Sequence, residues 1–146
     1  MNLKTLLRNI GELGKAQKLI NHSAAGTSLD QINGMEVEWY PMLFTCPAGT
    51  HTVRENTTRY SLTLYYIDRL LTDYSNDIDI YSSALEGLKN LVNGIKHIPG
   101  VVDVEDGYQI RNFAATEKMN DSLAGAYATL FITVVNDTVC FVDGEE

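Results

Sequence analysis

The chain has 146 residues, and its 19 acidic side chains outnumber its 11 basic ones, which gives a formal net charge of −8. A chain of this length is predicted to form one domain, residues 1–146, with a core large enough to fold without a metal or disulfide bridges. Because affinity for nucleic-acid phosphates and anionic membranes comes from Lys and Arg, this charge argues against both as binding partners.

Two cysteines, Cys46 and Cys140, lie far apart in the sequence and form no CxxC or zinc-ligand spacing. We interpret both as buried, reduced thiols. The N-terminal stretch carries Lys4, Arg8 and Glu12 among its apolar residues, which is not the pattern of a signal peptide. The chain is therefore expected in a reducing cytoplasm, or in a particle assembled there.

The first predicted element is an amphipathic helix near the N-terminus, with Asn2 as its N-cap. Its expected apolar face consists of Leu3, Leu6, Leu7, Ile10, Leu13, Leu19 and Ile20. A polar connection over residues 21–34 follows. Alternating apolar and acidic residues over 35–39 predict a half-buried strand, which Pro41 ends.

The middle of the chain is predicted to hold a loop, a strand and a helix. A second short apolar piece at 42–44 leads into a projecting polar loop at 47–57. Residues 58–68 alternate as a strand does, and a helix is expected over about 78–97, where Pro99 and the glycine after it stop it. The buried stripe of that helix is predicted to be Ala84, Leu88, Leu91, Val92 and Ile95.

The last third of the chain is predicted to hold three or four strands. The Asp106-Gly107 pair predicts a tight hairpin turn between strands at 101–104 and 108–113. Residues 123–135 form the most strand-like run in the chain, and 139–142 could pair back as a short strand. The expected fold class is α+β: an antiparallel or mixed sheet of about four to five strands packed with two helices.

No catalytic, cofactor or metal site is expected. The three histidines lie in separate segments, and none has the i, i+4 partner of a helical metal site. Residues 11–15 have two residues between their glycines where a phosphate loop needs four. The acidic run at 73–79 lacks the Gly and Glu that a calcium loop requires. The chain is therefore predicted not to be an enzyme.

The strand at 123–135 carries no charge on either face. The face of Ala126, Ala128, Leu130, Ile132 and Val134 is expected to pack against the helix at 78–97. The opposite face, with Tyr127 and Phe131 and joined by Tyr65, is expected to lie against the N-terminal helix or an adjacent subunit. Interfaces are enriched in aromatic residues and depleted of charge, so both interpretations remain open.

The order of these parts resembles a known family. The strings that carry the resemblance are the polar loop TVRENTTR, the strand YSLTLYYID leading into an acidic turn and helix, and NDSLAGAY entering the last long strand. Over roughly residues 1–135 the chain resembles the tail terminator and related neck proteins of tailed bacteriophages, of the lambda type. The resemblance implies a tail-terminator-like fold and a structural role in the virion, after assembly in the host cytoplasm.

Such proteins form homo-oligomeric rings around the DNA channel, so the resemblance implies a hexamer, with a dodecamer as the alternative. The partners would be adjacent neck, portal-side or tail proteins, with genomic DNA passing through and no membrane. The acidic charge suits such a channel because it repels phosphates. In the projecting loop, Val53, Arg54, Glu55 and Asn56 are expected to touch a neighbouring subunit or ring. The competing hypothesis is a small cytoplasmic binding domain or an enzyme without a recognisable motif.

Overall fold

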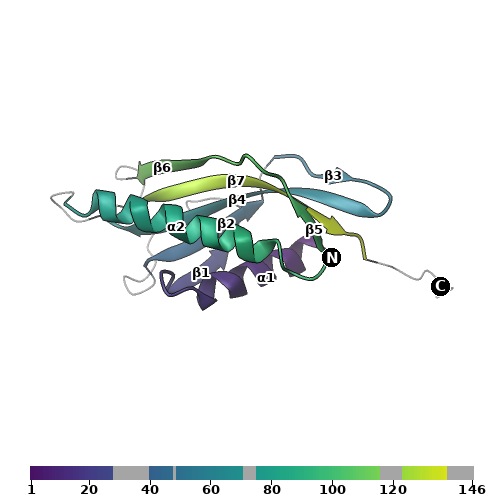
Figure 1. Cartoon of the computed structure of the whole chain (residues 1–146), viewed down its shortest axis with the longest axis horizontal. Helices are drawn as coiled ribbons and strands as arrows, with labels where there is room; N and C mark the ends of the chain where they lie inside the picture. The colour runs from purple at the N-terminus through teal and green to yellow at the C-terminus, as the bar shows by residue number, and fades with distance from the viewer. Residues whose placement is uncertain (28–39, 48, 71–74, 116–122, 138–146) are drawn as a thin grey trace.

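The computed structural model describes residues 1–27, 40–47, 49–70, 75–115 and 123–137. Within these ranges the chain forms two helices and a mixed sheet of seven strands, which confirms the predicted α+β class with more strands than expected (Figure 1). In chain order the elements are α1 (Leu3–Ala16), β1 (His22–Ala25), β2 (Met42–Pro47), β3 (Thr52–Val53), β4 (Thr57–Arg69), α2 (Asp77–Ile95), β5 (Val101–Val104), β6 (Ile110–Ala115) and β7 (Leu123–Val135).

Two strands of 13 residues each form the centre of the sheet. β4 and β7 are antiparallel and stay in register from Thr57 opposite Val135 to Arg69 opposite Leu123. The other edge of β4 is occupied by β2 and β3, and the other edge of β7 by β5 and β6. β1 pairs parallel to β2 and ends the sheet on that side. The central pair therefore positions every other strand.

The run predicted as a strand at 123–135 coincides with β7, and the strand predicted at 58–68 extends by one residue at each end as β4. The two backbones approach closely at Gly125, which stands opposite Ile67. A Cβ atom at position 125 would lie 1.8 Å from the carbonyl oxygen of Tyr66. Only glycine fits there, because any larger residue would require the two backbones to separate.

Both helices pack on the same face of the sheet. Leu6 and Ile10 of α1 belong to one buried cluster with the apolar stripe of α2 and with the alternate residues of β4 and β7 that include Leu62 and Leu130. All five residues predicted for the α2 stripe are buried, and the β7 residues predicted to face α2 join the same cluster. Asn2 caps α1, because its Oδ1 accepts a hydrogen bond of 2.8 Å from the Thr5 amide.

Three predictions near the N-terminus need correction or fall outside the described residues. Helix α1 ends at Ala16, so Leu19 and Ile20 lie beyond it, and Leu19 is exposed. Part of the predicted polar connection, residues 22–25, forms β1 instead, because backbone hydrogen bonds to β2 do not require an apolar side-chain pattern. The strands predicted at 35–39 and 139–142 lie outside the described residues.

The hairpin predicted around Asp106 and Gly107 is wrong. β5 and β6 do not pair with each other but follow one another along the same edge of β7, both antiparallel to it. β7 is long enough to bond to both segments, and the residues between them leave the edge as an excursion in which Gly107 has a φ of 80°. The predicted loop at 47–57 is likewise interrupted, because β3 returns to the edge of β4.

Candidate protein interface on the helix-free face

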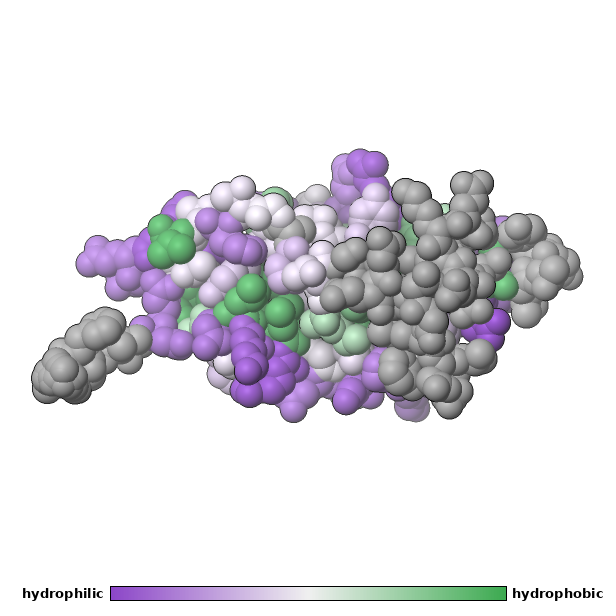
Figure 2. Space-filling view, turned by 180° about the vertical axis from the view of Figure 1, so that it is seen from behind, coloured by the Kyte–Doolittle hydropathy of each residue, from purple (hydrophilic) through white to green (hydrophobic). Residues whose placement is uncertain are grey.

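The side of the central strands opposite the two helices is the candidate site, and we call it the helix-free face. Its residues are Arg59, Ser61, Thr63 and Tyr65 of β4 and Tyr127, Thr129, Phe131 and Thr133 of β7. Within the described ranges no helix residue packs on it. Figure 2 views the molecule from the side opposite α2, where pale, mildly polar residues lie in the upper middle, a hydrophobic patch lies below them, and strongly hydrophilic residues gather mainly at the left and lower margins.

Three aromatic rings meet on this face. Tyr65 and Tyr127 are direct partners across the central pair, with ring centroids 5.6 Å apart. Phe113 of β6 stands edge-on to Tyr65 at 5.9 Å and lies 6.2 Å from Tyr127. Burial, followed by the proximity of Cys46 and Tyr127, raises the pKa of the Tyr65 hydroxyl, so it stays protonated at neutral pH. The cluster thus offers apolar ring surface with neutral hydroxyl groups.

Farther along the face the contacts become polar. The hydroxyls of Thr63 and Thr129 are 3.1 Å apart across the central pair. The guanidinium of Arg59 lies 4.1 Å from the centroid of the Phe131 ring and is 3.0 Å from the Glu105 carboxylate. The Arg59 cation is therefore balanced by an aromatic ring and an acid, so a partner could cover this position without meeting an unpaired charge there.

A hollow of about 270 Å³ borders this face. The excursion between β5 and β6 forms one wall, and Tyr127, Thr129 and Phe131 form the floor. Arg111 also lines it, together with acidic Glu105. The hollow offers both signs of charge beside aromatic surface, which suits a protein side chain better than a single ionic ligand.

A second buried cluster lies on the same side of the sheet, at the end of the central pair where Ile67 and Leu123 are found. It contains Tyr40, Met42, Phe44, Cys46, Ile67 and Leu123. Cys46 is free and buried, as predicted, and burial raises the pKa of its thiol, which keeps it protonated. Cys140 lies outside the described residues. Among the described residues, the half-exposed aromatic side chains on this side are Tyr65, Phe113, Tyr127 and Phe131.

The second group of predicted contact residues occupies the turn between β3 and β4. Val53, Arg54, Glu55 and Asn56 are all exposed, and Val53 is 74% accessible. The turn does not project freely, because the Arg54 amide donates to the Thr57 carbonyl at 2.8 Å.

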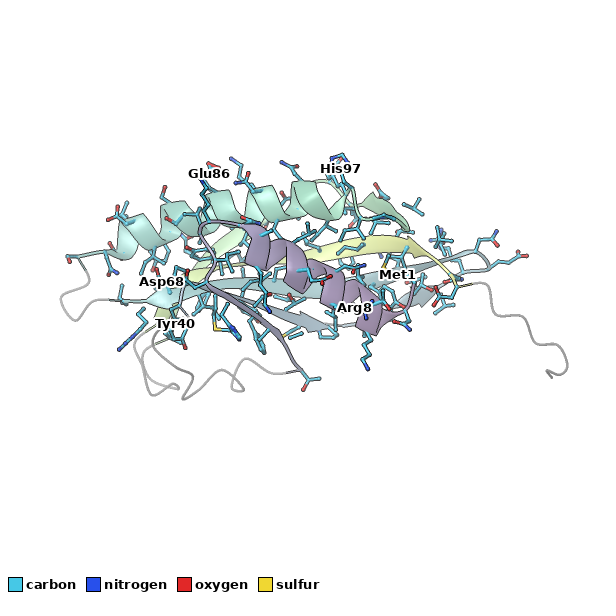
Figure 3. All side chains as sticks on the ribbon, turned by 90° about the horizontal axis from the view of Figure 1, so that it is seen from below. Met1, Arg8, Tyr40, Asp68, Glu86 and His97 are labelled. Carbon is cyan, nitrogen blue, oxygen red and sulfur yellow. The ribbon has the colours of Figure 1, made fainter. Side chains whose placement is uncertain are left out.

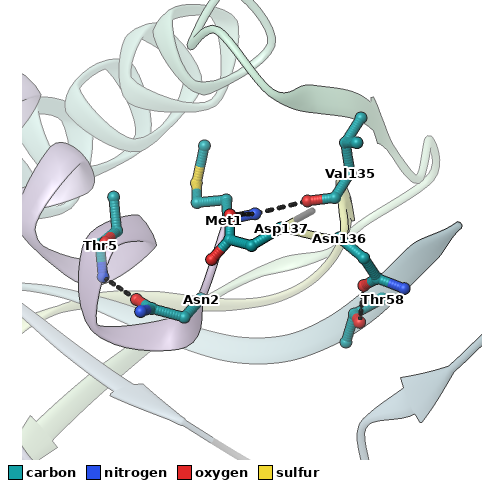
Figure 4. Close-up of polar contacts among 7 residues, drawn as sticks. All are labelled: Met1, Asn2, Thr5, Thr58, Val135, Asn136 and Asp137. Atoms are coloured by element: carbon teal, nitrogen blue, oxygen red, sulfur yellow. Dashed lines mark hydrogen bonds and ion pairs between the residues drawn. The ribbon is translucent and has the colours of Figure 1, made fainter. Parts of the chain in front are cut away.

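Hydrogen bonds from Asn136, which follows β7, connect this turn to the end of β7. Its side-chain amide donates to the carbonyls of Arg54 and Glu55 at 2.9 and 3.2 Å, and its backbone amide donates to Asn56. Figure 4 shows the same corner, where the hydroxyl of Thr58 donates to Asn136 and the amine of Met1 contacts the Val135 carbonyl and Asp137. The turn is a rigid, exposed corner.

The structure brings Tyr65, Tyr127 and Phe131 onto one face but leaves residues 53–56 at the far end of β4. The expectation that α1 might cover the aromatic face is wrong, because α1 packs on the opposite side with α2. Sequence reasoning missed Phe113 and Glu105, which reach the face from the β5–β6 edge. No local pattern could have revealed them, since the sequence predicted a hairpin there.

Among the histidines, His51 is held by contacts within the fold. The Nδ1 atom of His51 accepts a hydrogen bond of 3.2 Å from the Ser61 amide, and its ring stands edge-on to Tyr60. Among the described residues, no three metal-ligating side chains gather into a group that could hold a metal ion. In the same part of the chain, no helix is long and apolar enough to span a bilayer.

No protein-family model matches the chain, and none of the curated proteins matches it.

Proposed function

We propose that this protein is a structural ring subunit of a bacteriophage neck or tail, a tail terminator or head–tail connector that joins portal-side and tail components around the DNA channel. The observation that carries the proposal is the helix-free face. The two central strands, which neither α1 nor α2 covers on this side, present half-exposed Tyr65, Tyr127 and Phe131 with uncharged threonines between them. This composition is typical of the centre of a protein–protein interface.

Ring assembly explains two exposed surfaces of different character. A closed ring of identical subunits uses heterologous contacts, in which one patch of a subunit meets a different patch of the next. The helix-free face supplies an aromatic patch, and the rigid corner at residues 53–56 supplies a polar one that includes Arg54 and Glu55. We assign the first to the contact between subunits and the second to a neighbouring subunit or an adjacent ring.

The acidic composition supports the same proposal. A net charge of −8 on each subunit is multiplied in a hexamer or dodecamer. A ring lumen with such a potential repels DNA phosphates, so the genome passes without sequence-specific binding. The partners proposed above and below the ring are the adjacent neck, portal-side or tail proteins of the particle.

Native mass measurement of the purified chain tests this proposal directly. We expect a species of six or twelve chain masses, formed by the chain alone or after addition of a neighbouring ring protein. Phe131→Asp should keep the secondary structure and cooperative unfolding of the chain while shifting the assembly to smaller species. Val53→Asp at the exposed corner should also leave the fold intact and should weaken stacking between rings.

Leu130→Asp is the control for folding, because it stands next to Phe131 on the same strand but on the helix-covered face, where it is fully buried. A buried unpaired charge costs several kcal/mol, so this variant should unfold. If Phe131→Asp also unfolds the chain, the helix-free face is core and not interface. A chain that stays monomeric at all concentrations, with or without neighbouring proteins, contradicts the ring and favours the competing small binding domain.

A further inference from the structure

A groove runs between α1 and the edge strand β1. It has a volume of about 600 Å³ and is lined by Leu3, Lys4, Leu7, Arg8, Gly11, Glu12, Lys15, Ser23, Ala24 and Ala25. Figure 3 shows Arg8 pointing from α1 away from the α2 side of the molecule. The groove lies apart from the helix-free face, and the proposed ring contact does not use it.

Two observations indicate that the groove accepts an extended peptide segment. Among the described residues, no strand pairs with the outer edge of β1, and an edge of this kind can accept a further strand. The hydroxyl of Ser23 is buried at the floor of the groove and has no hydrogen-bond partner in the part of the chain that the structure describes. Half-buried Leu3 and Leu7 add apolar contact area along the opposite wall.

The charge of the groove identifies the chemistry of the segment. Lys4, Arg8 and Lys15 line it against the single acid Glu12, although the whole chain carries a charge of −8. The pKa of His22, at the start of β1, is lowered by burial and by the positive charge of Lys15. A cationic groove on an acidic protein selects an acidic segment.

The chain itself contains such a segment. Residues 138–146 have the sequence TVCFVDGEE, in which four consecutive apolar residues precede three acids and no base occurs. The segment follows Asp137, which contacts the amine of Met1 at the start of α1. Fully extended, nine residues span about 30 Å, which is longer than the roughly 21 Å of a 14-residue helix such as α1.

We propose that residues 138–146 of one copy bind in the α1–β1 groove of a neighbouring copy, as an extended strand along the outer edge of β1, with their acids against Lys4, Arg8 and Lys15. This inference rests on the proposed ring and names a contact that would link its subunits.

Geometry favours a second copy over the same chain. β7 ends opposite Thr57 of β4. Ala25 of β1 pairs with Thr45 of β2, and Thr45 in turn pairs with Leu64 of β4, which is seven residues farther along β4 than Thr57. That distance is about 23 Å along the strand, before the three strand spacings of about 5 Å from β7 to β1 are crossed. The residues that directly follow β7 in the same chain therefore start this far from Ala25, whereas those of a neighbouring copy are not held to this distance.

Charge-swapped variants of the full-length chain test the proposal. The groove variant carries Lys4→Glu and Arg8→Glu, and the tail variant carries Asp143→Lys, Glu145→Lys and Glu146→Lys. Each alone should raise the concentration needed for half-assembly by about tenfold or more, because like charges then face each other across the contact. Lys89→Glu, on the exposed side of α2, is the matched control and should assemble as the parent chain does.

The decisive measurement is the assembly of a one-to-one mixture of the two variants. Each groove then meets a tail of opposite charge when the two chains alternate, so the mixture should assemble at parental concentrations as an even-numbered species. If both variants assemble normally, or if the mixture fails to restore assembly, the proposal is wrong. If the chain forms only dimers or open chains, and their formation depends on the groove residues, the contact is upheld and the proposed ring function is wrong. If rings form and none of the five substitutions affects them, the ring is upheld and the contact proposed here is wrong.

Discussion

The same two strands present two faces of different character, because alternate residues of β4 and β7 point to opposite sides. On the helix-covered side, Leu62, Leu130 and their neighbours are completely buried under α1 and α2. On the helix-free side, Tyr127 and Phe131 are half-exposed, and Thr129 is open to solvent. Neighbouring residues of one strand therefore differ in role: the aliphatic set stabilises the fold, and the aromatic and hydroxyl set forms the interface that we propose.

The two sides also differ in how they tolerate change. Aliphatic side chains in a close-packed core are held by neighbours on every side, so a deletion leaves a cavity. Rings and hydroxyls on a half-exposed sheet face lose fewer contacts when they are altered. Mutations on adjacent positions of β7 should consequently separate folding from assembly.

The largest effect is expected at the position that joins both faces, Gly125. Gly125→Ala places a methyl group 1.8 Å from the carbonyl oxygen of Tyr66, which forces the central strands apart. We expect the variant to fail to fold, as measured by circular dichroism and thermal unfolding. Gly94→Ala is the control, because its Cβ would meet Leu13 at an ordinary 3.5 Å and should stabilise α2 by about 0.5–1 kcal/mol. A Gly125→Ala chain with parental stability would show that the central pair can separate locally.

A second comparison uses neighbours on β7. Leu130→Ala removes a fully buried side chain and should lower the free energy of unfolding by about 2–5 kcal/mol. Thr129→Ala on the opposite face removes one hydroxyl contact with Thr63 and should cost only about 1 kcal/mol. Urea unfolding of both variants measures the difference, and equal losses would contradict the division of the sheet into a covered and a helix-free side.

A third prediction concerns the balanced cation of the helix-free face. Arg59 lies over Phe131 and pairs with exposed Glu105. A double-mutant cycle of Arg59→Ala and Phe131→Ala should give a coupling free energy of about 0.5–1 kcal/mol, as expected for a solvent-accessible cation–π contact. Glu105→Gln should change stability by less than about 1 kcal/mol, because exposed ion pairs contribute little. A coupling free energy of zero would mean that the ring does not hold the guanidinium.

The smallest effect is expected on the covered side, at Asp68. Burial raises the pKa of its carboxyl, an effect that the hydrogen bond from the Arg69 amide partly offsets. The unfolded chain ionises this group at lower pH than the folded chain, so its contribution to stability falls as pH rises from the ordinary Asp pKa through the raised one. Asp68→Asn should therefore be more stable than the parent at neutral pH, and the two should converge below about pH 4. Parallel stability curves would contradict this.

Local sequence determined the elements whose signals are self-contained. The alternation in β4 and β7, the apolar stripe of α2 and the Asn2 cap each depend on residues only a few positions apart, and each was predicted correctly. The sequence likewise pointed to Tyr65, Tyr127 and Phe131 as residues of one face. Their proximity follows from the register of the central pair, in which Tyr65 stands directly opposite Tyr127.

The sequence predicted which face of β7 packs against α2, but only the tertiary structure decided that α1 packs on that same side. Both faces of β7 are uncharged, so the alternation of its residues left either face available to α1. β1 was missed because its short sequence is held by backbone hydrogen bonds to β2. The turn signal at Asp106-Gly107 was misassigned because β5 and β6 gain more pairing along the 13-residue edge of β7 than with each other. Long-range pairing of this kind depends on strands far apart in the chain, which no local pattern encodes.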